Sequence, residues 1–183
     1  MGTRSLTVFV DNSHDKPKEL GVLYRQFDGY PSGHGADLAN FLDQFILKNG
    51  YAGTEKWDEK VANGPECLWA QIVSYFKVQF QKEQAQRLIR KPEQNTTIGN
   101  FYLHAAGTRD YGEEWIYTIY YNGTSTGGLF EDKLKKSPLT IEVVNIYTDQ
   151  KDKFEIYHND GVLFIPSTHM EKVEDEFRRC GNV

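Results

Sequence analysis

The sequence carries little positive charge. Its 183 residues include 21 Lys and Arg against 26 Asp and Glu, which gives a net charge of -5 and a pI of about 5.6. Proteins that bind long nucleic acids cluster Lys and Arg to neutralise phosphates. We therefore expect no long nucleic acid as a partner, although a local basic pocket for a small anion is compatible with this composition.

Cysteines and long apolar runs are also scarce. The two cysteines, Cys67 and Cys180, have a spacing that fits neither a metal site nor a disulfide framework. The first residues contain no apolar signal core, and no window is apolar enough to span a membrane. These absences predict a cytoplasmic protein with no membrane partner.

Histidines are scattered and do not suggest a metal centre. The sequence has no His-x-x-x-His pair and no carboxylates clustered around its histidines. We therefore expect neither a bound metal ion nor a cofactor. The histidines outside the segment discussed below are His14, His104, His158 and His169.

Large side chains, in contrast, are abundant. Apolar residues make up 39% of the chain and aromatic residues 14%, with 11 Tyr and 11 Phe. That content is enough to build a hydrophobic core, so we do not expect the whole chain to be disordered. A length of 183 residues suits a single domain spanning residues 1–183.

The first half of the chain predicts a hairpin followed by two helices. Alternation predicts strands over 6–10 and 20–27, paired so that residue numbers sum to about 30 and Leu6 faces Tyr24. Apolar residues at three- and four-residue steps predict amphipathic helices over 38–46 and 68–80. The stretch 51–64 is polar and is expected to be irregular.

The second half predicts strands and a short terminal helix. Strands are expected over 101–104, 115–121 and 139–147, and a hairpin over 154–165 turns at Asn159-Asp160-Gly161. Residues 170–179 have the pattern of a short helix. The fold class predicted is therefore α+β, a mainly antiparallel sheet with two central helices packed on it and a short C-terminal helix.

The stretch that attracts a functional interpretation is Arg25–Gly35, between the second strand and the first helix. Three glycines lie in it, and a helix N-terminus with glycine-rich backbone binds anions readily. Arg25 and Arg4 are expected to add donors from neighbouring strands, while Tyr24 or Tyr30 stacks on a base. The predicted ligand-binding residues are Arg4, Tyr24, Arg25, Asp28, Tyr30, Ser32, Gly33, His34, Gly35 and Arg109.

A purely structural interpretation of the same stretch stays open. Asp28-Gly29 and Tyr30-Pro31 are common turn formers, and the glycines can simply allow a tight entry into the helix. Asp37 in the first helical turn can cap the amides itself. The spacing matches neither a P-loop nor the dinucleotide fingerprint. For Arg109, Asp110 and Glu113, a solvated loop tip competes with a second wall of the site.

Several of these segments resemble a family of small uncharacterised proteins of bacteria and their phages. The segments are Met1-Gly2-Thr3-Arg4-Ser5-Leu6-Thr7, Leu23-Tyr24-Arg25-Gln26, Asp28-Gly29-Tyr30-Pro31, Gly33-His34-Gly35 and Gly107-Thr108-Arg109-Asp110. The resemblance implies a protein of the bacterial host cytoplasm and a shared site formed by Arg4, Arg25, Asp28 and His34. By analogy of context, it also implies an action on host defence, such as sequestering a nucleotide signal.

Three functions follow as hypotheses. The first is a module that binds a nucleotide-like small molecule without turning it over. The second is an enzyme, a phosphodiesterase or a glycosyl-bond hydrolase or transferase, with His34 as acid or base and Asp28 orienting it. The third is an inhibitor that docks on a host protein. We also expect a homo-oligomer, with the aromatic second half at the interface.

Overall fold

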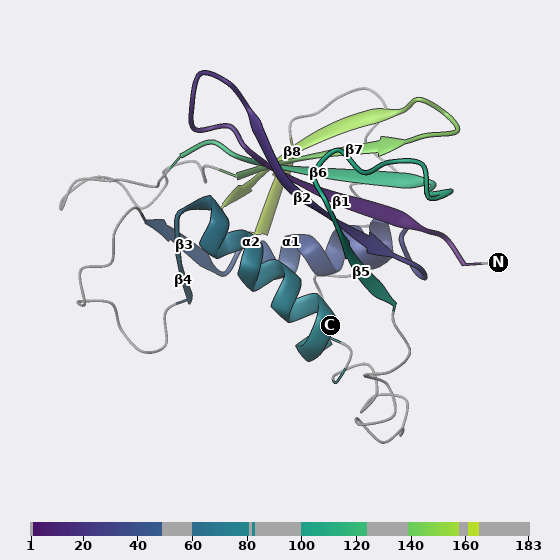
Figure 1. The fold of residues 1–183 in the computed structure, drawn as a ribbon, viewed down its shortest axis with the longest axis horizontal. Helices are drawn as coiled ribbons and strands as arrows, with labels where there is room; N and C mark the ends of the chain where they lie inside the picture. The colour runs from purple at the N-terminus through teal and green to yellow at the C-terminus, as the bar shows by residue number, and fades with distance from the viewer. Residues whose placement is uncertain are drawn as a thin grey trace.

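A seven-stranded sheet forms the framework of the computed structural model, which describes residues 2–48, 60–80, 82, 100–123, 139–157 and 161–164 (Figure 1). Its strand order is β5-β2-β1-β6-β7-β8-β9. The strands are β1 (Ser5–Asp11), β2 (Lys18–Arg25), β5 (Phe101–His104), β6 (Trp115–Tyr121), β7 (Leu139–Asn145), β8 (Lys151–Tyr157) and β9 (Gly161–Phe164).

The β1–β2 hairpin has the predicted register. Leu6 pairs with Tyr24 and Ser5 with Arg25, so paired residue numbers sum to 30 until the register shifts between Phe9 and Val10. Because side chains alternate between the two faces of a strand, this register decides which residues share a face. The predicted hairpin near residue 160 is also confirmed, since β8 pairs with β9 in antiparallel fashion.

The sheet is mixed. The α+β class is as predicted, and β1 pairs with β2 in antiparallel fashion, but β1 pairs with β6 in parallel along its whole length. Strands 5–11 and 115–121 are far apart in sequence, which leaves ample chain for the crossover that a parallel pair requires. An expectation of a mainly antiparallel sheet therefore misses the pairing that joins the two halves of the molecule.

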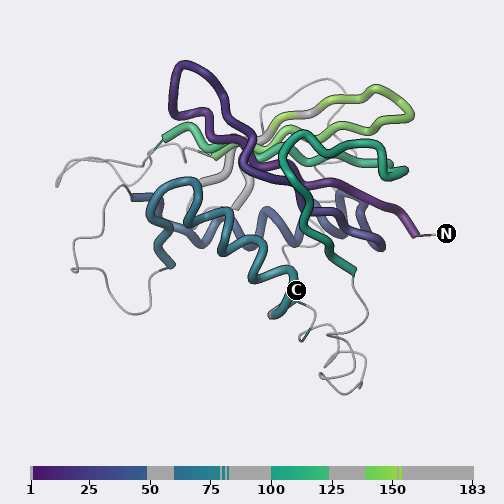
Figure 2. The backbone as a smooth tube through the Cα atoms, in the orientation of Figure 1, coloured from purple at the N-terminus to yellow at the C-terminus, as the bar shows by residue number. Residues whose placement is uncertain are grey.

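Both helices lie on the same side of the sheet (Figure 2). A π-helical turn η1 (Pro31–Gly35) leads into α1 (Ala36–Leu42), and α2 (Gly64–Ser74) continues into a second π-helical turn, η2 (Tyr75–Gln79). We call the sheet face that they cover the inner face. Its core includes Phe9 and Leu23 together with Leu38, Leu68 and Phe76 from the helical segments.

The opposite, outer face has its own apolar cluster. Leu6, Val8, Val22 and Tyr24 lie in it and are buried. All seven residues of β1 and the last five of β2 are buried, as expected for strands that are covered on both faces. Among the described helices, none is long and apolar enough to cross a membrane.

The first predicted helix is too long. α1 ends at Leu42, and Phe45–Lys48 form β3, which pairs in parallel with β4 (Lys60–Asn63) as a separate two-stranded sheet. Phe45 and Leu47 are buried in alternation, so an apolar pattern that also fits helical spacing is used here as a strand. The polar 51–64 stretch was expected to be irregular, yet β4 lies within it. The predicted helix over 170–179 lies outside the described residues.

Candidate functional site

Adjacent residues of the predicted site place their side chains on opposite faces of the sheet. Arg25, paired with Ser5, contacts the inner core, whereas Tyr24, paired with Leu6, belongs to the outer cluster. Arg4 lies on the outer side, because its charge acts on Tyr24 and its Nη1 atom would be 2.9 Å from a Cβ placed on Gly112. The predicted convergence of Arg4 and Arg25 is therefore wrong.

Arg25 is buried and hydrogen-bonded on the inner face. Only 3% of its surface is exposed. Its Nε donates to the carbonyl of Phe27 at 2.6 Å, and its Nη1 donates to Asp37 Oδ2 at 2.9 Å and to His34 Nδ1 at 3.1 Å. The guanidinium also lies 5.1 Å from the ring centre of Phe80, a distance typical of a cation–π contact.

His34 has no exposed surface, and its partners define its tautomer. Arg25 is a donor only, so Nδ1 of His34 must accept, and the ring proton then resides on Nε2, which donates to Thr7 Oγ1 at 2.5 Å. Burial, aided by the Arg25 charge, holds the pKa of His34 well below its usual value. We call Thr7, Arg25, His34 and Asp37 the inner network.

The glycine-rich loop closes on itself instead of presenting amides to a ligand. The N–H of Gly33 donates to the Tyr30 carbonyl at 3.0 Å, that of His34 donates to the Asp28 carbonyl at 3.0 Å, and that of Gly35 reaches the Tyr30 carbonyl at 3.5 Å. The anion-binding cradle predicted for Gly33 to Gly35 is therefore wrong, and the structural interpretation of the loop describes these glycines.

Close approach of the loop to β1 accounts for Gly29. A Cβ on Gly29 would lie 2.7 Å from the carbonyl carbon of Arg4, closer than van der Waals contact allows. The loop is also held by Gly29 N–H donating to the Thr3 carbonyl at 2.9 Å and by the Tyr117 hydroxyl donating to the Gly29 carbonyl at 2.9 Å. Glycine is needed here for packing.

The predicted acid–base pair of His34 and Asp28 does not form. Both ring nitrogens of His34 are used by Thr7 and Arg25, and Asp28 contacts His34 through its backbone carbonyl. The Asp28 residue is exposed, with a backbone φ of 56°. Tyr30, 39% exposed, and the half-buried Ser32 belong to the same loop.

Four aromatic rings gather on the outer face around Tyr24. Its ring centre lies 5.9 Å from that of Tyr102, 6.2 Å from that of His104 and 6.0 Å from that of Tyr111, and the His104 and Tyr111 rings are 4.5 Å apart. We call these four residues the tyrosine patch. Tyr102 and Tyr111 are 47% and 48% exposed, so part of each ring is open to a partner.

Polar groups order this patch. The Tyr24 hydroxyl donates to Gln26 Oε1 at 2.5 Å, and the buried carboxylate of Glu113 accepts from the amides of Asp110 and Tyr111 at 3.2 and 2.7 Å. Burial raises the pKa of Tyr24, and the nearby Arg4 charge opposes that rise without cancelling it. Tyr24 is therefore a neutral hydroxyl near pH 7.

Arg4 is a cation beside the patch, as is Lys77, whose Nζ lies 5.5 Å from the ring centre of Tyr102. Within the described ranges its guanidinium takes part in no hydrogen bond or ion pair, which distinguishes it from Arg25. Arg109 forms a bidentate pair with Glu19, at 3.1 and 2.9 Å, and Glu19 also accepts from the Gly107 amide at 2.6 Å. Arg109 thus anchors its own loop to the far end of β2.

Sequence reasoning missed the contribution of β5 and of the loop after it. Tyr102 and His104 point to the outer face because β5 pairs with β2 in a register that sets Tyr102 beside Tyr24. No short-range pattern predicts a pairing across almost eighty residues. The one local signal is Tyr111, which directly follows the segment Gly107-Thr108-Arg109-Asp110 in the sequence.

Comparison of the chain with protein-family models, with curated proteins and with solved structures found no match. The resemblance to bacterial and phage proteins therefore stays a prediction. Among the described residues, no group of three or more His, Cys, Asp or Glu is arranged to hold a metal ion.

Proposed function

We propose that the protein binds a nucleotide or another phosphorylated planar molecule at the tyrosine patch. The observation that carries the proposal is the position of Arg4, a guanidinium without an ion-pair partner in the described structure, beside four clustered rings. The ligand class is the one expected from the sequence. The site lies on the outer face of the sheet and does not include the glycine-rich loop.

The chemistry of the patch suits such a ligand. The exposed rings of Tyr102 and Tyr111 offer faces on which a base can stack, and stacking of one base on an aromatic side chain contributes about 1–3 kcal/mol. Arg4 can donate two parallel hydrogen bonds to a phosphate, and a hydrogen bond to a charged group contributes about 1.5–3 kcal/mol. Together these interactions account for selective binding of an anion with a flat ring.

Binding without turnover is favoured over catalysis. His34, the residue proposed as acid or base, is buried in the inner network with both ring nitrogens hydrogen-bonded. The tyrosine patch itself contains no hydrogen-bonded nucleophile–base pair among the described contacts. The resemblance to phage proteins adds the hypothesis that the ligand is a host defence signal, which the protein sequesters.

Calorimetry with mononucleotides, NAD and cyclic dinucleotides tests the proposal. We expect one or more of them to bind, with affinity reduced about tenfold or more in Tyr102→Ala and in Arg4→Gln. Tyr147→Ala is the matched control, since Tyr147 is 73% exposed on the β7–β8 turn, and its affinity should equal that of wild type. Absence of binding across the panel, or equal loss in Tyr147→Ala, would overturn the proposal.

Recovery of the ligand separates binding from catalysis. After incubation and heat release, chromatography should return the bound nucleotide intact. Conversion to products by wild type, abolished by a substitution of His34 that leaves binding unchanged, would favour the enzyme hypothesis instead.

A further inference from the structure

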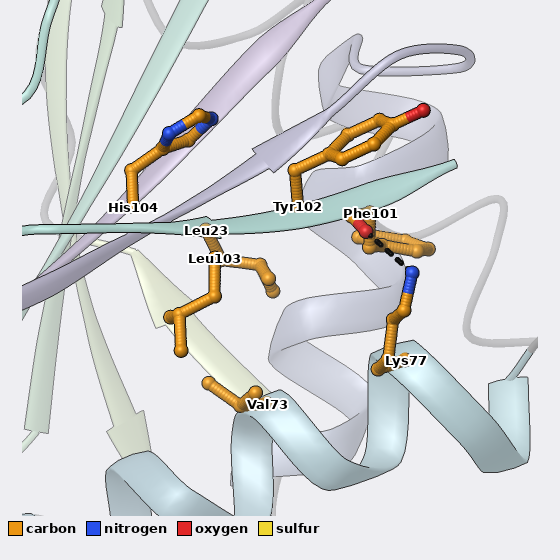
Figure 3. A pocket seen from close by; sticks show the side chains of 7 residues that line it. All are labelled: Leu23, Val73, Lys77, Phe101, Tyr102, Leu103 and His104. Carbon is orange, nitrogen blue, oxygen red and sulfur yellow. Dashed lines mark hydrogen bonds between the residues drawn. The ribbon is translucent and has the colours of Figure 1, made fainter. Parts of the chain in front are cut away.

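A groove lies on the side of β5 that faces the helices, between that strand and the α2–η2 helix (Figure 3). Its volume is about 300 Å³, at the lower end of the range for small-molecule pockets. Val73 and Lys77 line it from the helix, and the sheet contributes Leu23, Phe101, Tyr102, Leu103 and His104. Figure 3 shows Leu103 pointing towards the helix while the rings of Tyr102 and His104 point away from it.

β5 is the edge strand of the sheet, and part of its outer backbone has no partner strand in the described structure. The Asn100 carbonyl accepts from Gln26 and so faces β2. Because successive residues of a strand present their polar groups to opposite edges, Phe101 and Leu103 face outwards. Lys77 Nζ donates to the Phe101 carbonyl at 2.9 Å, which leaves Leu103 as the residue whose amide and carbonyl are available.

The charge of the groove selects the occupant. Lys77 is exposed, and its ammonium donates one of its three N–H groups to the Phe101 carbonyl. None of the residues that line the groove is acidic. An occupant that pairs with Leu103, fills an apolar groove and brings a negative charge to Lys77 has the chemistry of an extended peptide ending in a free carboxylate.

We propose that this groove captures the C-terminus of a partner protein by adding it as a strand to β5. The last residue lies beside Lys77, which donates to its carboxylate, so the peptide runs antiparallel to β5. The residue opposite Leu103 exchanges hydrogen bonds with that residue's amide and carbonyl. Its side chain enters the groove between Leu23 and Val73, which selects a large aliphatic group.

The groove borders the tyrosine patch, because Tyr102 and His104 of the patch also line it. The test of the groove therefore uses residues outside the patch. The probe is a library of heptapeptides immobilised through their N-termini, with free C-terminal carboxylates, compared with the same library ending in amides. We expect wild type to retain carboxylate peptides with an aliphatic residue near the end, and to retain their amides at least about tenfold less strongly.

Three variants locate the binding. Lys77→Met and Leu103→Pro should each reduce retention about tenfold, the first by removing the cation and the second by removing the outward amide donor, a change that edge strands tolerate. Leu103→Ala keeps that amide and should retain more peptide than Leu103→Pro. Lys16→Met, at an exposed lysine in the β1–β2 loop, should bind like wild type.

Retention that is equal for amides, or unchanged in Lys77→Met, would overturn the proposal, as would a library from which nothing is retained. Binding of dodecanoate in place of any peptide would reassign the groove to lipid carboxylates. Self-association that Leu103→Pro abolishes would reassign the β5 edge to pairing with a second copy of the chain. Thermal unfolding of each variant verifies that it is folded.

Discussion

Two polar clusters begin at adjacent residues of β2 and have opposite characters. Arg25 leads into the inner network, where the residue is 3% exposed and its guanidinium is hydrogen-bonded to Asp37, His34 and the Phe27 carbonyl. Tyr24 leads into the tyrosine patch, where two rings are about half exposed and Arg4 has no ion pair within the described residues.

The difference separates stabilisation from recognition. A buried polar cluster whose members satisfy one another stabilises a unique arrangement of the chain, here the closure of the 28–35 loop over β1. An exposed cluster of rings beside an unpaired guanidinium keeps its interactions available for a partner. The motif that is most conspicuous in the sequence thus belongs to the inner network, whereas the proposed binding site lies on the opposite face.

Replacing each of the two arginines should give the largest difference in the free energy of unfolding. Arg25→Met should lower the free energy of unfolding by about 3 kcal/mol, since it leaves the buried His34 and the Phe27 carbonyl without a donor and Asp37 without its cation. Arg4→Met should change it by less than about 0.5 kcal/mol. Urea denaturation measures both, and similar losses in the two variants would contradict the comparison.

A methyl group on Gly29 tests whether the loop glycines serve packing. Gly29→Ala should cost about 2 kcal/mol of stability, because its Cβ would meet the Arg4 carbonyl carbon at 2.7 Å and the backbone must shift. The change should leave ligand affinity at the tyrosine patch unchanged at a temperature where the variant is folded. A stable variant that loses ligand affinity would show that the loop takes part in ligand binding.

Acid should weaken the inner network through His34. A neutral buried histidine whose pKa is lowered in the folded state binds fewer protons than it does unfolded, so its stabilisation is complete above about pH 6.5 and declines as the pH falls from there towards the folded pKa. The slope should reach about 1.4 kcal/mol per pH unit.

Urea denaturation of wild type and His34→Gln between pH 7 and pH 5 measures this slope. The variant should show a flatter profile, whatever its stability at pH 7. Burial would raise the carboxylate pKa values of Asp11 and Glu19, but hydrogen bonds from Ser13 to Asp11 and from Arg109 and Gly107 to Glu19 lower them. Their effect on stability therefore lies at more acidic pH, below the ordinary values of 3.8 and 4.5. Parallel profiles for the two proteins would show that His34 is not held neutral.

The smallest effects on stability are expected at the patch. Tyr102→Ala and Tyr111→Ala should each lower the free energy of unfolding by about 1 kcal/mol, because roughly half of each residue is exposed and the loss is confined to ring contacts within the patch. Their thermal unfolding should therefore resemble that of wild type even though ligand affinity falls. A loss above 2 kcal/mol would assign these rings to the core instead of a binding surface.

Local patterns in the sequence predicted the strands and their hairpins well. The hairpin register was confirmed, and it already separates Arg4 from Arg25, because residues one position apart across paired strands point to opposite faces. The expectation of a common arginine site did not apply that alternation. Long-range features escaped prediction: the parallel β1–β6 pair, the β3–β4 pair formed from an apparent helix end, and the placement of Tyr102 beside Tyr24.

Nuclear magnetic resonance of the arginine side chains tests the central claim most directly. During titration with a nucleotide that binds, the Nε–Hε signal of Arg4 should shift progressively, while that of Arg25, whose Nε donates to the Phe27 carbonyl, should stay in place. A shift of Arg25 with Arg4 unmoved would place the ligand at the inner network and contradict the account.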